Sequence, residues 1–246
     1  MLSIATSISF LVFLINSYLL RKGSYDGVNS DAKKHAFASS KYKEWGFWPS
    51  GMHKFATNKA WMKDVGILLT LIFQKILRDS KSFYPGLMVG NLCHCLSAVL
   101  IFLLTDKFLN EEISLIIFAL YIFSPWSYMI IFHGGFQLTA QFFFLLSIFM
   151  LPFFYGYHLD NFINYFISGL FIALTNFSSA SSRKLNPVYF FFLVLSIAFG
   201  EESKHFLEFN LSSYEIFYLI FPILLILLMT LITIFNKTIT NLIYQD

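Results

Sequence analysis

Long uncharged apolar runs, separated by polar segments that are mostly short, make up most of the chain. A helix rises 1.5 Å per residue, so crossing a bilayer core about 30 Å thick takes about 20 apolar residues. The runs predicted to span are 2–20, 84–105, 113–132, 136–157, 162–177 and 214–235, with a shorter seventh at 187–200 that would have to thin the bilayer or stay partly buried. The pattern therefore predicts an all-α, polytopic transmembrane helical bundle of 6–7 spans in a single domain, 1–246.

The first run, 2–20, has the length of a span and contains no charge. A signal peptide is the alternative, but no positive segment precedes the run and no small-residue cleavage site follows it. We therefore interpret it as the first transmembrane helix. Pro125, Pro152 and Pro222 fall within later runs, where kinks are tolerated because neighbouring helices satisfy the freed carbonyl groups.

Composition supports a membrane protein. The chain is 57% hydrophobic and 13% charged, with a mean hydropathy of +0.66, whereas a soluble domain carries about 25% charged residues. A lipid bilayer, plasma or endoplasmic reticulum membrane, is the expected surrounding. The net charge of +3 and the lack of a basic tract interleaved with aromatics argue against nucleic acid as a partner. Cys93 and Cys95 flank His94 at a spacing that does not suit zinc, so we interpret them as thiols within a span.

One long polar segment, 21–64, interrupts the apolar pattern and holds nine of the seventeen Lys and Arg residues and three of the four tryptophans. Such rings find burial or the headgroup region. This favours an ordered juxtamembrane loop over the alternative, a solvated linker. The apolar segment 65–77, next along the chain, is too short to span comfortably. We predict a short interfacial helix there, with Lys75, Arg78 and Lys81 reaching the headgroups.

The loop contains a carboxylate and two histidines in a pattern that suggests a pocket. Asp31 and His35 are four residues apart and would share one face of a helix. Three turn-forming residues, Gly46, Pro49 and Gly51, would then bring His53 back toward that helix.

These motifs resemble the start of membrane glycosyltransferases of the GT-C superfamily, of the polyprenyl-phosphate-sugar-dependent type. The matching residues are Asp31, His35, Gly46-Phe47-Trp48-Pro49, Pro49-Ser50-Gly51-Met52-His53, Phe123-Ser124-Pro125-Trp126 and Gly134-Gly135-Phe136-Gln137. The resemblance covers roughly residues 1–157. Members of the superfamily are usually longer, with more spans and often a soluble domain, so this chain would be a minimal relative, a fragment or a subunit.

The resemblance implies a transferase that moves a sugar from a polyprenyl-phosphate donor to a lipid, glycan or protein acceptor. Asp31 would be the catalytic carboxylate, because deprotonating an acceptor hydroxyl requires a positioned base. Asp26, in the same loop, is the rival for that role. His35 and His53 would hold the carboxylate, the donor phosphate or a divalent metal.

The resemblance also implies cations that bind the donor. Lys33 and Lys34 of the loop, and Arg78 after segment 65–77, would neutralise the lipid-linked phosphate at the level of the headgroups. Whether a divalent metal is also needed is left open by the sequence.

The sidedness of loop 21–64 is also left open. If the N-terminus is outside and 65–77 lies flat, fifteen of the seventeen Lys and Arg residues fall on the cytoplasmic side, as the positive-inside rule favours. The loop is then cytoplasmic, opposite to the arrangement of the GT-C family. If 65–77 crosses as a compressed helix, the loop lies outside.

The competing function is a non-enzymatic integral membrane subunit or transporter component whose loop binds a protein partner. A transporter is expected to place ionisable residues at mid-membrane. The predicted spans are nearly free of them, His94 being the clearest exception. This scarcity favours an enzyme acting at the membrane edge.

Overall fold

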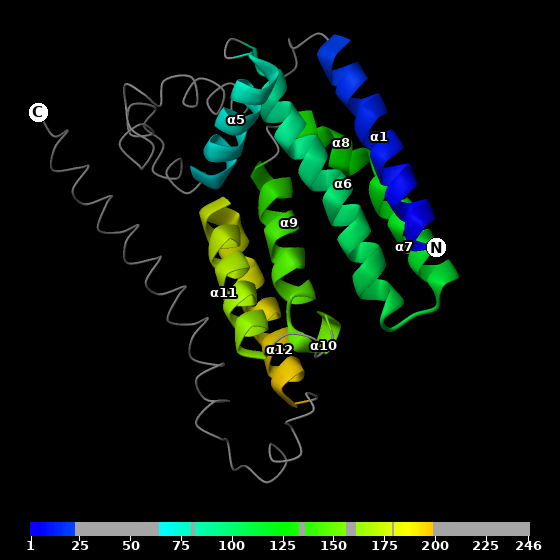
Figure 1. Ribbon diagram of the computed structural model, residues 1–246, viewed down its shortest axis with the longest axis vertical. Coiled ribbons are helices and arrows are strands. Elements are labelled where there is room, and N and C mark those ends of the chain that lie inside the picture. Colours follow the sequence, from blue (N-terminus) through cyan, green and yellow to red (C-terminus); the bar gives the residue numbers. More distant parts are fainter. Residues whose placement is uncertain (23–63, 80–81, 133–135, 156–160, 179, 199–246) are drawn as a thin grey trace, which may run out of the picture.

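The structure is a computed structural model that describes residues 1–22, 64–79, 82–132, 136–155, 161–178 and 180–198. Helices, and no strand, form the described part (Figure 1). They are α1 (Leu2–Lys22), α5 (Asp64–Leu77), α6 (Tyr84–Asp106), α7 (Glu111–Ile122), α8 (Pro125–Phe132), α9 (Phe136–Phe149), α10 (Pro152–Tyr155), α11 (Asn161–Ser178), the 3-10 helix η3 (Ala180–Leu185) and α12 (Asn186–Ala198). The all-α prediction is confirmed for these residues.

Two helices of the described part are long and apolar enough to cross a membrane. α1 has 21 residues and a mean hydropathy of 1.8, and α6 has 23 residues and a mean hydropathy of 2.2. The apolar helices α5, α9, α11 and α12 are shorter. The predicted helices at 2–20 and 84–105 are therefore confirmed at span length, while the predicted span 214–235 lies outside the described residues.

Two of the predicted runs are each divided at a proline. The run 113–132 forms α7 and α8, which are separated just before Pro125. Proline has no N–H to donate, and its ring disfavours helical backbone at the preceding residue. The Ser124 N–H instead bonds to the Tyr121 carbonyl at 3.2 Å, which tightens the end of α7. Pro152 likewise separates α9 from α10 within 136–157. The prolines thus end helices here rather than only kink them.

α1 and α6 pack together in antiparallel orientation through a seam of polar side chains. The Asn16 Nδ2 donates to Asn91 Oδ1 at 3.1 Å, and the Ser9 hydroxyl donates to the Cys95 carbonyl at 3.1 Å. Asn16, Asn91 and Ser9 are buried, so these hydrogen bonds are shielded from solvent. The seam sets the register of the two long helices, because a slip would leave buried amides without partners.

Contacts at the two ends of the α1–α6 pair show which helix ends lie next to each other. The Tyr84 hydroxyl, at the start of α6, donates to the Ser17 carbonyl near the end of α1 at 3.3 Å. At the opposite end, the N-terminal ammonium of Met1 lies 3.7 Å from the Glu111 carboxylate, where α7 begins. The chain therefore leaves α1 and enters α6 at the same end of the bundle (Figure 1).

Three buried apolar clusters hold the helices together. One joins the ends of α1 and α8 to the starts of α6 and α9: Leu20, Leu87, Val89, Cys93, Ile131 and Leu138. A second joins α1, α6 and α7: Ala5, Val12, Cys95, Ala98, Phe102, Phe118 and Ile122. The third lies among α9, α10, α11 and α12: Phe144, Ile148, Leu151, Phe154, Tyr165, Ile172, Tyr189, Leu193 and Ile197. The first cluster brings the end of α8 and the start of α9 close to the end of α1.

His94 of α6 supports the break between α7 and α8. Its Nε2 lies 3.1 Å from the carbonyl oxygen of Ile122, the last residue of α7, and its ring packs on Tyr121 with 5.0 Å between centroids. A carbonyl oxygen only accepts, so Nε2 carries the proton in this hydrogen bond. His94 thus has a structural contact at the proline break.

The two cysteines point in different directions, as their spacing predicts. The Cys93 thiol faces Thr139 of α9, with 3.7 Å between Sγ and Oγ1, and the Cys95 thiol faces Asn91 of its own helix, with 3.9 Å between Sγ and Oδ1. Both thiols are free and buried.

Replacing Asn91 with leucine tests the polar seam. Asn91 bonds to Asn16, to the Phe13 carbonyl and to the Ser17 hydroxyl, so Asn91→Leu removes all three hydrogen bonds. Interhelical hydrogen bonds in membrane proteins contribute about 0.6 kcal/mol on average. We expect Asn91→Leu to lower the free energy of unfolding by about 1–2 kcal/mol, measured by equilibrium unfolding in detergent micelles.

Thr6→Val is the control, because the exposed Thr6 hydroxyl bonds only within its own helix. It should leave the free energy of unfolding nearly unchanged. Equal stability of the Asn91→Leu variant and the parent chain would contradict a stabilising seam.

Candidate functional site

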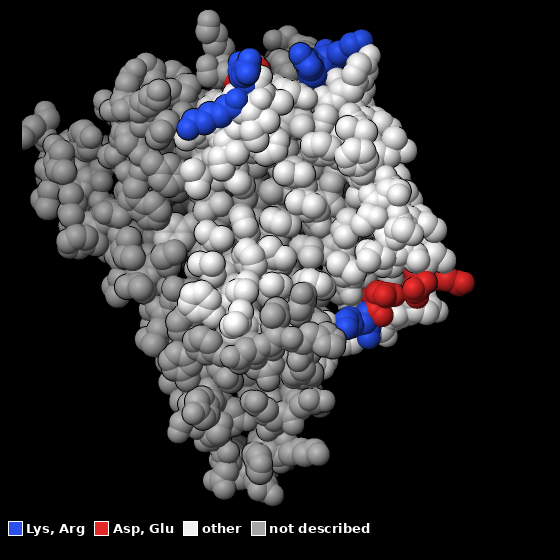
Figure 2. Space-filling model, in the orientation of Figure 1, with Lys and Arg blue, Asp and Glu red and all other residues white. Residues whose placement is uncertain are grey.

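Charged side chains gather at two ends of the described bundle. Figure 2 shows cations at one end, carboxylates with a cation at the other, and an uncharged surface between them on the face in view. The first group, here called the arginine end, consists of Arg21, Lys22, Lys75 and Arg78, all exposed. The second, here called the acidic end, consists of Asp106, Lys107, Glu111 and Glu112, also exposed. The arginine end is the better candidate for binding an anion.

The backbone that carries Arg78 forms a Schellman motif at the end of α5. The Asp79 N–H donates to the Gln74 carbonyl at 3.0 Å, and the Arg78 N–H donates to the Lys75 carbonyl at 3.4 Å. These two hydrogen bonds satisfy carbonyl groups that a helix end leaves without intrahelical partners. The motif fixes where α5 ends and in which direction the chain leaves it.

Arg78 occupies the left-handed position of this motif, with φ at 53°. Glycine usually takes that position, because a side chain there costs roughly 1–2 kcal/mol. Residues held in disfavoured backbone regions cluster at functional sites. The exposed Arg78 guanidinium is thus carried on a backbone conformation that costs free energy.

The acidic residue next to Arg78 is engaged within the turn. The Asp79 carboxylate accepts hydrogen bonds from the Ser82 N–H, at 3.0 Å, and from the Ser82 hydroxyl. The same Ser82 oxygen accepts from the Tyr84 N–H at 3.3 Å, at the first turn of α6. Asp79 therefore joins the end of α5 to the start of α6. Arg21, Lys22 and Arg78 make no ion pair with any residue in the described ranges.

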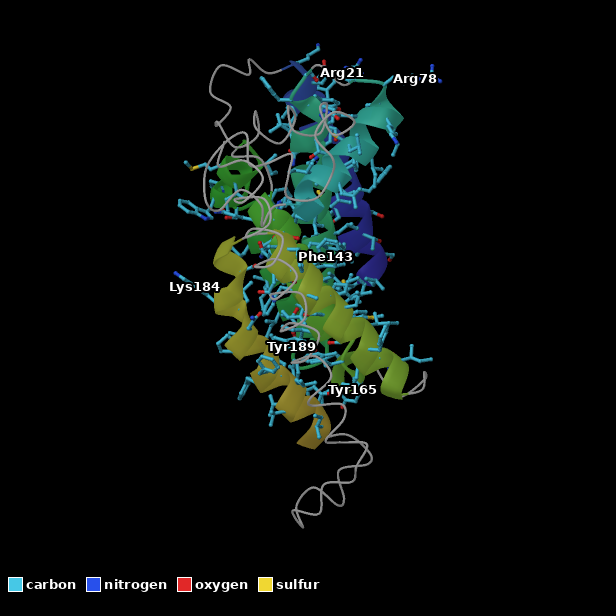
Figure 3. The ribbon with its side chains drawn as sticks, turned by 90° about the vertical axis from the view of Figure 1, so that its left-hand side faces the viewer. Arg21, Arg78, Phe143, Tyr165, Lys184 and Tyr189 are labelled. Carbon is cyan, nitrogen blue, oxygen red and sulfur yellow. The ribbon has the colours of Figure 1, made fainter. Side chains whose placement is uncertain are left out.

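Arg21 and Arg78 lie at the same end of the long axis although 57 positions separate them (78 − 21) (Figure 3). α1 ends there, and α6 begins beside it. Lys22 extends over the ring of Tyr18, with 4.6 Å from Nζ to the ring centroid. The arginine end is thus built by the end of α1 and by the corner between α5 and α6.

The structure describes one of the residues predicted for the donor-binding site. This residue, Arg78, lies at the arginine end. The remaining predicted site residues, namely Asp26, Asp31, Lys33, Lys34, His35 and His53, lie outside the described residues, so the predicted pocket stays a prediction. The same holds for loop 21–64 as an ordered cap and for any divalent metal bound there.

Arg21 and Lys22 were not predicted from the sequence as partners of Arg78. Their position in the last turn of a span, next to the polar loop, was the available signal. The left-handed backbone of Arg78 had no signal in the sequence, because glycine or asparagine normally marks such a turn.

The interior of the described part is polar only through neutral groups and one histidine. Its buried polar side chains are those of Ser, Thr, Asn, Gln, Tyr and His94, and no Asp, Glu, Lys or Arg is buried among the residues whose side chains the structure describes. Among the described residues, no group of three or more His, Cys, Asp or Glu is placed to hold a metal ion.

Comparisons with known proteins return no match to this chain: no family model, no curated protein and no solved structure.

Replacing Arg78 with glycine separates its structural cost from its charge. Glycine adopts the left-handed conformation at no steric cost, so Arg78→Gly should raise the free energy of unfolding of the α5–α6 corner by about 1 kcal/mol. The measurement is hydrogen exchange at the amides of α5 in detergent micelles, where slower exchange is expected.

Arg78→Ala is the matched control, because alanine also removes the cation but keeps a Cβ in the disfavoured conformation. It should exchange as the parent chain does. Faster exchange in Arg78→Gly would contradict backbone strain at this position.

Proposed function

We propose that the chain is a multi-pass membrane protein whose predicted 6–7 spans are built from α1, α6, α7 with α8, α9 with α10, α11, α12 and 214–235. Large apolar side chains on the outside of most of these helices support this proposal. Among the most exposed are Phe10 (63%), Ile116 (59%), Leu120 (71%), Trp126 (69%) and Phe191 (60%). Contiguous exposed apolar surface is unfavourable in water, whereas in lipid it has no such cost. The uncharged surface between the two charged ends in Figure 2 fits the same arrangement.

In this proposal α5 is the interfacial helix predicted at 65–77. Its inner face is buried, with Ile67, Thr70 and Gln74 each less than 5% exposed. Its outer face is also apolar and includes Ile72 and Ile76, which are 43% and 68% exposed. A short helix with an apolar outer face and cations at one end suits the boundary between acyl chains and headgroups.

We infer that the protein is a membrane glycosyltransferase that takes a sugar from a polyprenyl-phosphate donor and transfers it to a lipid, glycan or protein acceptor. The observation that carries this proposal is Arg78 in a left-handed position at the end where α1 and α6 meet. Arg21 and Lys22 lie at the same end. Guanidinium groups bind phosphate through charge-assisted, often bidentate hydrogen bonds. Cations at the headgroup level suit a phosphate whose polyprenyl chain stays in the bilayer.

The loop that joins α1 to α5 supplies the proposed chemistry. Asp31 is the proposed base that accepts the proton of the acceptor hydroxyl as the new C–O bond forms and the bond from the sugar to the donor phosphate breaks, releasing polyprenyl phosphate. Asp26 is the alternative base. His35 and His53 position the base, the donor phosphate or a divalent metal, and Lys34 adds a cation for the phosphate. These roles are supported by the resemblance to GT-C enzymes and by the residue spacing.

A transporter component receives less support from the described residues. A coupled transporter is expected to hold charged groups within its bundle. In the part of the chain that the structure describes, the buried polar groups are neutral side chains and His94.

Binding of the donor phosphate tests the role of Arg78. Native mass spectrometry would compare retention of polyprenyl phosphate with that of the uncharged polyprenol by the full chain. Arg78→Gln should lower retention of the phosphate about tenfold, since a hydrogen bond between charged groups contributes roughly 1.5–3 kcal/mol. Arg78→Lys should restore part of it.

Lys107→Gln is the matched control for charge, because Lys107 is an exposed cation at the acidic end. It should bind as the parent chain does. Equal retention of polyprenyl phosphate and polyprenol by the parent chain would contradict a donor-phosphate site.

An assay of sugar transfer tests the proposed catalytic role of Asp31. Asp31→Asn keeps the volume but removes the basic carboxylate, so it should lower the rate of sugar transfer about 10²–10⁴-fold. The measurement is transfer from radiolabelled polyprenyl-phosphate sugars in membranes that contain the full chain. Asp26→Asn is the control, and loss of transfer there with Asp31→Asn active would move the base to Asp26.

A further inference from the structure

We propose that the arginine end faces the cytoplasmic leaflet and contacts its anionic headgroups, which puts loop 21–64 on the cytoplasmic side. The proposal rests on membrane insertion, which is part of the proposed function, and not on transferase activity. It deepens the proposed function by stating the side of the membrane on which transfer would take place.

The contact between α1 and α6 limits how often the chain between them can cross the bilayer. The Ser17 carbonyl near the end of α1 accepts a hydrogen bond at 3.3 Å from Tyr84 at the start of α6. Two such contacting ends lie at the same depth. The intervening chain, 23–83, leaves and returns to that depth, so it crosses the bilayer an even number of times.

The sequence of residues 23–83 indicates that this number of crossings is zero. Segment 23–63 is polar throughout and holds no uncharged apolar run of span length, so it supplies no crossing. If α5, with 14 residues, crossed the bilayer, it would be the single crossing of this segment. A single crossing is excluded because the number of crossings must be even. The alternative in which 65–77 crosses as a compressed helix is therefore inconsistent with the packing of α1 on α6. Loop 21–64 therefore lies on the same side of the bilayer as the arginine end.

The balance of charge assigns the two ends to the two sides of the membrane. The arginine end carries four described cations and one described carboxylate, that of Asp79. By the crossing count, the seven lysines within 23–63 lie on the same side of the bilayer as the arginine end. The acidic end carries two positive charges, Lys107 and the Met1 ammonium, against three carboxylates, those of Asp106, Glu111 and Glu112. Lys and Arg in short loops next to spans are retained on the cytoplasmic side, where anionic lipids give the surface a negative potential.

This sidedness differs from that of the GT-C enzymes that the loop resembles, whose corresponding loop is not cytoplasmic. The donor sugar would then be presented on the cytoplasmic leaflet. A polyprenyl-phosphate sugar taken there has to be made, or delivered, on that same side.

Cysteine labelling tests the assignment in the full chain. Arg78→Cys and Lys107→Cys would be expressed in the plasma membrane of a bacterial host and treated with a membrane-impermeant maleimide. The parent chain gives the background, because Cys93 and Cys95 are buried. We expect Lys107→Cys to be labelled in intact cells and Arg78→Cys only after permeabilisation.

The reverse pattern would overturn the proposal, and so would labelling of both variants in intact cells. Labelling of neither variant after permeabilisation would show that these ends do not lie at the two membrane surfaces, and would also overturn it. The labelling pattern does not depend on sugar transfer, so an inactive enzyme with the expected pattern would contradict the proposed function alone.

Lipid retention tests the contact with anionic headgroups. The full chain would be reconstituted in bilayers of equal phosphatidylglycerol and phosphatidylcholine and then delipidated, and the retained lipids would be quantified. We expect enrichment of phosphatidylglycerol, reduced at least about fivefold in the Arg21→Gln, Lys22→Gln and Arg78→Gln triple variant, the effect of roughly one cation near an anionic surface. Lys107→Gln should leave the enrichment unchanged. No enrichment in the parent chain would overturn the contact.

Discussion

The antiparallel packing of α1 on α6 determines where the connections and charged ends of the described bundle lie. Asn16 and Asn91 bond to each other across the interface, where both side chains are buried, and an unpaired amide there would cost free energy. This pairing fixes the register of the two longest helices. It thereby brings the end of α1 beside the start of α6, although more than sixty residues lie between Lys22 and Tyr84 (84 − 22). The arginine end exists because of that register.

The described bundle separates its charge from its interior. Neutral side chains satisfy one another inside, as Ser168 does with the Ser147 carbonyl at 2.7 Å and the Tyr189 hydroxyl at 3.0 Å. Charged side chains lie at the ends. An arrangement of this kind leaves the interior to hold the helices together and leaves the charged groups at the ends of the described bundle.

Much of the described fold could be predicted from the sequence, because apolar run length depends only on local composition. The runs 2–20 and 84–105 appear as α1 and α6, and 65–77 appears as α5. The division of 113–132 at Pro125 was harder to predict, since a proline within a long apolar run either kinks or ends a helix, depending on its neighbours. Here His94, from another helix, contacts the carbonyl at the break. A contact between residues of two different helices cannot be predicted from the local sequence of either helix.

The candidate site could be predicted only in part. Arg78 was identified from its charge and from its place after an apolar segment. Its left-handed backbone, and its position at the same end as Arg21, follow from tertiary packing, which single-sequence patterns do not contain. The predicted pocket of Asp31, His35 and His53 rests on spacing and resemblance alone, because those residues lie outside the described part of the chain.

The backbone at Arg78 also has an evolutionary consequence. A single base change converts any arginine codon to a glycine codon, and at this position the exchange would relieve backbone strain. Drift toward stability alone would therefore favour glycine. Persistence of arginine in descendants of this chain would measure selection on the charge, independently of any knowledge of the ligand.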